Sequence, residues 1–93
     1  MGCKNNPGKF DCYTNAEPDE PMFVLLGRDP VAPFLVSLWA KIRYGDAEAA
    51  FYVFQKMCKT LIPKYDAAPD VDKVAEATDC AMAMREWRRI NRP

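Results

Sequence analysis

The sequence predicts an all-α protein: a small single domain spanning residues 1–93, with three to four helices and an irregular N-terminal arm. Two helix starts follow one another between residues 17 and 34, where Asp19 and Asp29 can each cap a helix that opens near a proline. Further along, apolar residues recur at three- and four-residue steps, which is the spacing of one buried helix face. Gly45 and Pro63 interrupt these periodic stretches and predict helix ends.

The arm, residues 1–18, contains glycine, proline and asparagine with few branched apolar residues, so we expect irregular structure. Its apolar side chains Phe10, Cys12 and Tyr13 are expected to hold it against the rest of the domain. Helices are predicted over residues 19–26, 30–44, 46–62 and 70–91.

The segment 20–26 is ambiguous, because Met22 to Leu26 is a continuous apolar run that also fits a buried strand. The flanking capping residues favour a short helix. The helix predicted over 46–62 is apolar over a wide arc, since Tyr52 and Val53 lie off the stripe that contains Phe51 and Phe54. Such a helix is either buried on two sides or meets a partner.

Composition excludes several classes of function. The chain has 93 residues, 49% of them apolar, and its 13 basic residues balance its 13 acidic ones, so disorder is not expected and no global field favours nucleic acid. No run approaches the roughly 20 apolar residues that span a bilayer, and the N-terminus lacks a secretory or myristoylation pattern. We expect a cytoplasmic protein with reduced cysteines, no membrane partner and no nucleic-acid partner.

Catalytic groups are scarce. The chain has no histidine, and its one serine, Ser37, lacks the nucleophile context of a hydrolase. Four scattered glycines cannot build a phosphate-binding loop. We therefore predict a protein that is not an enzyme and uses no cofactor.

The four cysteines predict no metal site, because zinc sites usually contain closely spaced cysteine pairs and four ligands. Cys58 and Cys80 fall on helix faces that resemble core and are interpreted as small buried apolar residues. Whether Cys3 and Cys12 pair with each other or bind a metal stays open.

Candidate binding residues form two groups. Arg28 and Asp29 stand where one predicted helix ends and the next begins. Either Asp29 caps the helix and Arg28 is exposed, or Arg28 and the free amides near Val31 form an anion-binding corner. Asp29 as a cap would compete for the same amides.

The second group is a basic stripe on the last helix, spaced i, i+3, i+4 and i+7. Its members are Arg85, Arg88, Arg89 and Arg92. Cations near a helix C-terminus favour the helix dipole, and the stripe could also face an acidic partner or a phosphate-bearing ligand. Tyr13 or Trp39 could then stack on a nucleotide base.

The chain resembles small uncharacterised proteins encoded by tailed bacteriophages. The resemblance rests on CKNNPGKFDCY at residues 3–13, NAEPDEPMF at 15–23, LLGRDP at 25–30 and AP at 32–33, and on VAEA at 74–77, CAMAM at 80–84 and WR at 87–88. Residues 45–70 match less well. The resemblance implies a phage accessory protein in the cytoplasm of a bacterial host, and supplies no activity.

These observations favour a non-catalytic phage protein that inhibits a host defence system, in the manner of an anti-CRISPR, by stoichiometric binding to a host protein. One alternative is a small-molecule binder that sequesters a nucleotide immune signal. Another is a structural or DNA-associated phage protein. Homo-oligomers are also expected, because a chain of this size with exposed aromatic residues often covers them by self-contact.

Overall fold

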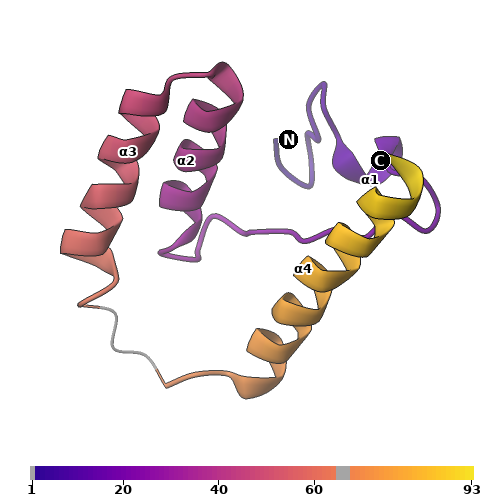
Figure 1. The fold of residues 1–93 in the computed structure, drawn as a ribbon. Coiled ribbons are helices and arrows are strands. Elements are labelled where there is room, and N and C mark those ends of the chain that lie inside the picture. Colours follow the sequence, from indigo (N-terminus) through magenta and orange to yellow (C-terminus); the bar gives the residue numbers. More distant parts are fainter. Residues whose placement is uncertain (1, 65–67) are drawn as a thin grey trace. The chain divides into compact units, whose positions relative to one another are not determined.

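A computed structural model describes residues 2–64 and 68–93, and their regular structure is helical (Figure 1). It has helices α1 (Cys12–Asn15), α2 (Ala32–Tyr44), α3 (Ala47–Lys56) and α4 (Val71–Asn91), and a π-helical turn η1 (Met57–Leu61) directly after α3. No strand occurs in the described ranges; an isolated bridge joins Cys3 and Asn6. The predicted all-α class is confirmed.

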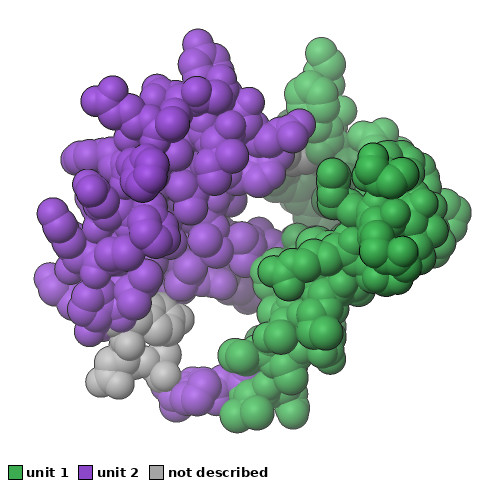
Figure 2. Space-filling model, viewed as in Figure 1, with its two compact units in different colours: residues 1–23, 71–93 green, residues 24–70 purple. Residues whose placement is uncertain are grey.

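The chain divides into two compact units, coloured separately in Figure 2. Unit 1 combines the two ends of the chain, Met1–Phe23 and Val71–Pro93. Unit 2 is the continuous segment Val24–Asp70 and contains α2, α3 and η1. Each unit is described by itself below.

Unit 2 is an antiparallel helical hairpin, in which α2 packs against α3 (Figure 1). Gly45 ends α2 with a left-handed φ of 89°, and its amide donates to the carbonyl of Ile42 over 3.1 Å. Asp46 then caps α3, because its Oδ1 accepts from the amide of Ala49 at 3.0 Å. A connection of only two residues therefore sets the two helices side by side.

The helix predicted over 30–44 begins two residues later than expected. Asp29 Oδ1 accepts from the amide of Val31 at 2.9 Å, and the Asp29 carbonyl accepts from the amide of Ala32 at 3.1 Å. This side-chain-capped turn encloses Pro30, so α2 starts at Ala32 and Pro33 takes a place in its first turn. Proline is tolerated there because first-turn amides have no intrahelical acceptor.

The helix predicted over 46–62 changes type before it ends. Its last turn is η1, closed by the bond from the Ile62 amide to the Met57 carbonyl at 2.9 Å. The Thr60 hydroxyl donates to the Lys56 carbonyl at 2.6 Å, and in an α-helix that carbonyl would accept the Thr60 amide. This competition favours the wider turn, and Pro63, which has no amide proton, follows it.

The helix predicted over 19–26 is wrong. Residues 20–26 have no regular secondary structure. A turn holds the segment's start, where the Glu17 amide donates to Glu20 Oε1 at 3.0 Å and the Glu20 amide donates to the Glu17 carbonyl at 3.1 Å. A helix of two turns gains little from its own hydrogen bonds, and five consecutive apolar residues give it no amphipathic face.

Unit 1 is built from the arm and α4. The thiol of Cys80 on α4 donates to the Met22 carbonyl at 3.4 Å, and Arg92 just after α4 pairs with Glu17 at 3.0 Å. Phe10 and Tyr13, predicted to hold the arm, are instead exposed, Tyr13 to 80%. The arm also contains the short helix α1, which Asp11 caps by accepting from the Tyr13 amide at 3.3 Å.

The cysteine predictions fail in part. Cys3, Cys12 and Cys58 are exposed, Cys80 is half-buried, and none is bonded to another. Cys58 is therefore not the core residue that helical periodicity indicates, because the face of the hairpin on which it lies is open to solvent.

Candidate binding surfaces on the helical hairpin

The corner at Arg28 is not available to an anion in the predicted way. The amides of Val31 and Ala32 already donate to the side chain and the carbonyl of Asp29. Asp29 thus caps the turn that precedes α2, whose own N-cap is Val31, and Arg28 lacks the free amides that would have completed an anion site with it.

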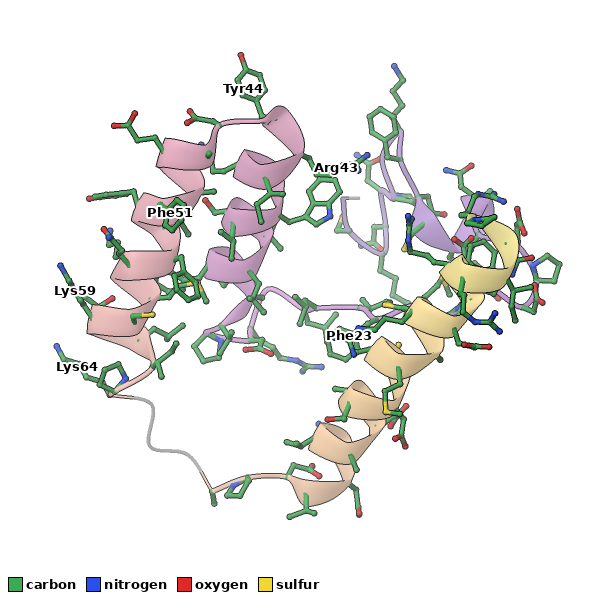
Figure 3. All side chains as sticks on the ribbon, in the orientation of Figure 1. Phe23, Arg43, Tyr44, Phe51, Lys59 and Lys64 are labelled. Atoms are coloured by element: carbon green, nitrogen blue, oxygen red, sulfur yellow. The ribbon has the colours of Figure 1, made fainter. Side chains whose placement is uncertain are left out.

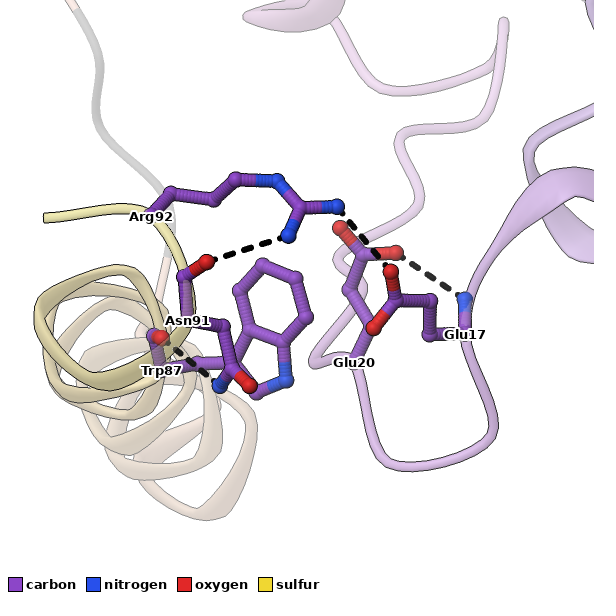
Figure 4. Close-up of polar contacts among 5 residues, drawn as sticks. All are labelled: Glu17, Glu20, Trp87, Asn91 and Arg92. Carbon is purple, nitrogen blue, oxygen red and sulfur yellow. Dashed lines mark hydrogen bonds and ion pairs between the residues drawn. The ribbon is translucent and has the colours of Figure 1, made fainter.

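Two of the four arginines in the basic stripe on α4, Arg89 and Arg92, form ion pairs. Glu86 accepts from Arg89 Nη2 at 2.6 Å and from Nε at 3.0 Å, and this pairing lowers the pKa of Glu86 and raises the pKa of Arg89. Arg92 donates to Glu17 and to the Asn91 carbonyl and lies over the Trp87 ring, 5.4 Å from its centroid (Figure 4). The guanidinium groups of Arg85 and Arg88 form no ion pair or hydrogen bond within the described residues.

The two aromatic residues expected to stack on a base fall in different units. Tyr13 belongs to unit 1, on α1, and Trp39 to unit 2, on α2. Trp39 is 57% exposed, and the guanidinium of Arg43 lies over its ring, 5.6 Å from the centroid. That contact is a cation–π pair between residues one helical turn apart.

One apolar surface of unit 2 is a groove between α2 and α3, which we call the apolar groove. Its volume is about 420 Å³, and its lining consists of Leu38, Ile42, Gly45, Ala47, Ala50, Phe51 and Phe54. No lining side chain carries a polar atom. Ile42 is 60% exposed, Phe51 68% and Phe54 51%, and Figure 3 shows Phe51 at the surface of α3.

A second hollow of about 250 Å³ involves the same two helices, and we call it the mixed groove. It is lined by Pro33, Phe34, Ser37, Tyr52, Val53 and Lys56. At about 100° per residue, Ser37 lies about 140° around α2 from Ile42, and Lys56 lies about 140° around α3 from Phe51. The two grooves are therefore on opposite faces of the hairpin.

The mixed groove has a basic character. Lys56 lines it, and Lys41 lies one turn after Ser37 on the same side of α2. Neither lysine forms an ion pair with a described residue, and no acidic side chain lines the groove. This face combines the aromatic side chains of Phe34 and Tyr52, the latter exposed, with positive charge that no lining residue neutralises.

Sequence reasoning missed these surfaces because it assigned the apolar stripes of both helices to a core. Only Ala32 and Met57 are buried among the described apolar residues, and both lie at the open end of the hairpin. The signal was present in the wide apolar arc of residues 46–62. Of the two interpretations that it allows, the exposed Phe51 and Tyr52 favour contact with a partner.

Comparison with known proteins provides no relative. No protein-family model matches the chain, and no curated protein or solved structure matches it either. Among the described helices, none is both long and apolar enough to cross a bilayer. In the described ranges, no three histidine, cysteine, aspartate or glutamate residues cluster as a metal site would require.

Proposed function

We propose that this protein is a non-catalytic inhibitor that binds a host protein stoichiometrically through the mixed groove. The observation that carries the proposal is the exposure of Tyr52, 66%, in a groove of unit 2 that Lys56 also lines. Tyrosine is enriched at the centre of protein–protein contacts, where its ring is buried and its hydroxyl finds a partner. The resemblance to phage proteins supports a component of a host defence system as the target.

The chemistry of the groove specifies the partner's surface. Lys41 and Lys56 are unopposed, so the complementary surface is acidic at its rim. The hollow between Pro33, Phe34 and Val53 accepts a protruding apolar side chain from that surface. Association is then expected to slow as salt rises, because charged rims mainly steer the encounter.

The experiment compares tagged wild-type protein with Tyr52→Glu after expression in the bacterial host. We expect one host protein to co-purify at equal stoichiometry with the wild type, and to be lost with Tyr52→Glu. Phe51→Glu is the matched control, since the neighbouring residue is equally exposed but lies on the other face. Binding is then remeasured with the two purified proteins. The proposal is wrong if no host protein reaches stoichiometric recovery, or if Tyr52→Glu retains the partner.

Sequestration of a nucleotide immune signal is the second candidate, and the unpaired Arg85 and Arg88 on α4 favour it. Guanidinium groups one turn apart suit adjacent phosphates. A thermal-shift series across a nucleotide panel tests it, because ligand at 100-fold excess over Kd should stabilise the protein by about 2.7 kcal/mol. An absence of any shift, or a shift that survives Arg85→Gln with Arg88→Gln, would count against this candidate.

A further inference from the structure

The apolar groove and the mixed groove differ in the kind of partner that they fit. The apolar groove presents only carbon-lined side chains between α2 and α3. Interfaces of that composition are typical of permanent assemblies, whereas transient contacts are about as polar as the rest of a protein surface. An exposed groove of this kind on a free chain is also an aggregation hazard, so we expect a partner to cover it.

We propose that the apolar groove is a self-association interface, occupied by the same groove of a second copy of this chain. Two antiparallel hairpins that face each other through their apolar sides form a four-helix bundle, a packing that buries the stripe of every helix. A two-fold axis makes such a contact self-complementary, because each groove both receives and supplies the same side chains. The hairpin of unit 2 is half of that bundle.

The exposed apolar area of this side of the hairpin approaches what a stable dimer needs. Ile42, Phe51 and Phe54 line the groove, and Trp39 lies one turn before Ile42 on α2; these four side chains are 51–68% exposed. Aromatic side chains bury about 150–250 Å² each, so these four offer roughly 500 Å² per copy and about 1,000 Å² in a symmetrical pair. Leu35 lies one turn before Leu38 on α2 and is also exposed, so it brings the total closer to the roughly 1,200 Å² at which stable interfaces begin.

Charge also distinguishes the two grooves as places for a second copy. Lys56 lines the mixed groove and no acidic side chain does, so two copies that faced each other there would bring like charges together. A second copy therefore fits the apolar groove and not the mixed groove.

The test is the mass in solution of the full chain at about 100 μM, by light scattering coupled to size-exclusion chromatography and by sedimentation velocity. We expect an assembly of at least twice the 10.6 kDa chain mass. Phe51→Glu should weaken self-association by about 30-fold or more, because it places a charge at the centre of the contact. Tyr52→Glu, which alters the adjacent and equally exposed position on the other face, should leave the mass unchanged.

Circular dichroism of each variant establishes that its helices remain, and Phe54→Gln serves as a milder second change to the same groove should Phe51→Glu unfold the chain. A wild-type protein that stays monomeric at this concentration would overturn the proposal, since the groove would then be covered within one chain or by another protein. Equal responses to Phe51→Glu and Tyr52→Glu would also overturn it. If a variant loses binding to the host protein but keeps the mass of the wild-type assembly, the result concerns the mixed groove and leaves self-association standing.

Discussion

Arg92 Nη2 lies 3.0 Å from Glu17 Oε1, so the last turn of the chain is tied to the turn that precedes residues 20–26. Seventy-five positions separate the two residues in sequence, and both belong to unit 1. The same guanidinium covers the Trp87 ring, while the Glu17 amide donates to Glu20 (Figure 4). One arginine therefore joins the arm, the turn and the end of α4.

Glu17→Gln is expected to loosen the arm locally and to change the overall stability of the protein little. The pair is partly exposed, with 58% and 47% of its side chains accessible, so its contribution to the free energy of unfolding should stay below about 1 kcal/mol. Hydrogen exchange should accelerate at the arm amides, and the difference from wild type should shrink at high salt. Glu86→Gln is the control, because its pair with Arg89 lies within α4 and cannot hold the arm. Equal exchange at the arm in both variants would contradict this role.

Trp87 has a buried indole nitrogen that finds no hydrogen-bond acceptor among the described residues. A buried unsatisfied donor is destabilising, whereas the ring itself packs beneath Arg92. Trp87→Phe should therefore leave stability nearly unchanged, since it keeps an aromatic face and removes the unpaired donor. Trp87→Ala should lower the free energy of unfolding much more than Trp87→Phe does, because it removes the ring as well. Chemical denaturation measures both, and a Trp87→Phe variant as unstable as Trp87→Ala would show that the nitrogen has a partner.

Local signals along the chain were sufficient to place the long helices and insufficient to predict the conformation of residues 20–26. Gly45 and Asp46 define the hairpin connection by themselves, through a left-handed cap and a side-chain cap, so its position follows from sequence. The segment 20–26 carries capping residues too, but its conformation depends on Glu20 turning back to the Glu17 amide and on Met22 meeting Cys80. Contacts over 58 residues, such as that one, leave no local pattern.

The character of the candidate binding surfaces was predictable from the sequence, and their position was not. Helical periodicity identifies Phe51 and Phe54 as one stripe and Tyr52 as outside it, which is how the two grooves divide them. Periodicity does not tell whether a stripe faces its own chain or solvent, because both require the same apolar residues. The anion corner failed for a different reason: Asp29 competes with a ligand for the same amides, and an intramolecular carboxylate is always present.

Asp11 provides a test that depends on pH. The Thr14 hydroxyl donates to Asp11 Oδ2 at 2.6 Å and is the main cause that lowers the pKa of Asp11, with the Tyr13 amide adding to it. A carboxylate with a lowered folded-state pKa stabilises the fold above its unfolded-state pKa, and this contribution is lost as pH falls through the folded-state value. The cap of α1 should therefore persist at neutral pH and fail in acid.

Thr14→Val is expected to raise the pKa of Asp11 toward its ordinary value, because the hydroxyl donor is gone, and α1 should then lose its cap at a higher pH. Thr14→Ser keeps the hydroxyl and should keep the lowered pKa. A carbon-detected NMR titration of the Asp11 carboxyl group measures the midpoint in all three proteins. Identical midpoints for Thr14→Val and Thr14→Ser would show that another donor controls this carboxylate.

Gly45 is the position where the hairpin depends on glycine. Its φ of 89° lies in the left-handed region, where a β-carbon is unfavourable even though nothing lies within 4 Å of the place that it would occupy. Gly45→Ala should lower the free energy of unfolding by about 1 kcal/mol, entirely through backbone strain. Gly27→Ala is the matched control, because that site is equally open and has no positive φ, so alanine there should be neutral or stabilising by about 0.4–1 kcal/mol. Denaturant unfolding at one fixed protein concentration compares the two, and a Gly45→Ala variant as stable as Gly27→Ala would mean that the connection between α2 and α3 tolerates another geometry.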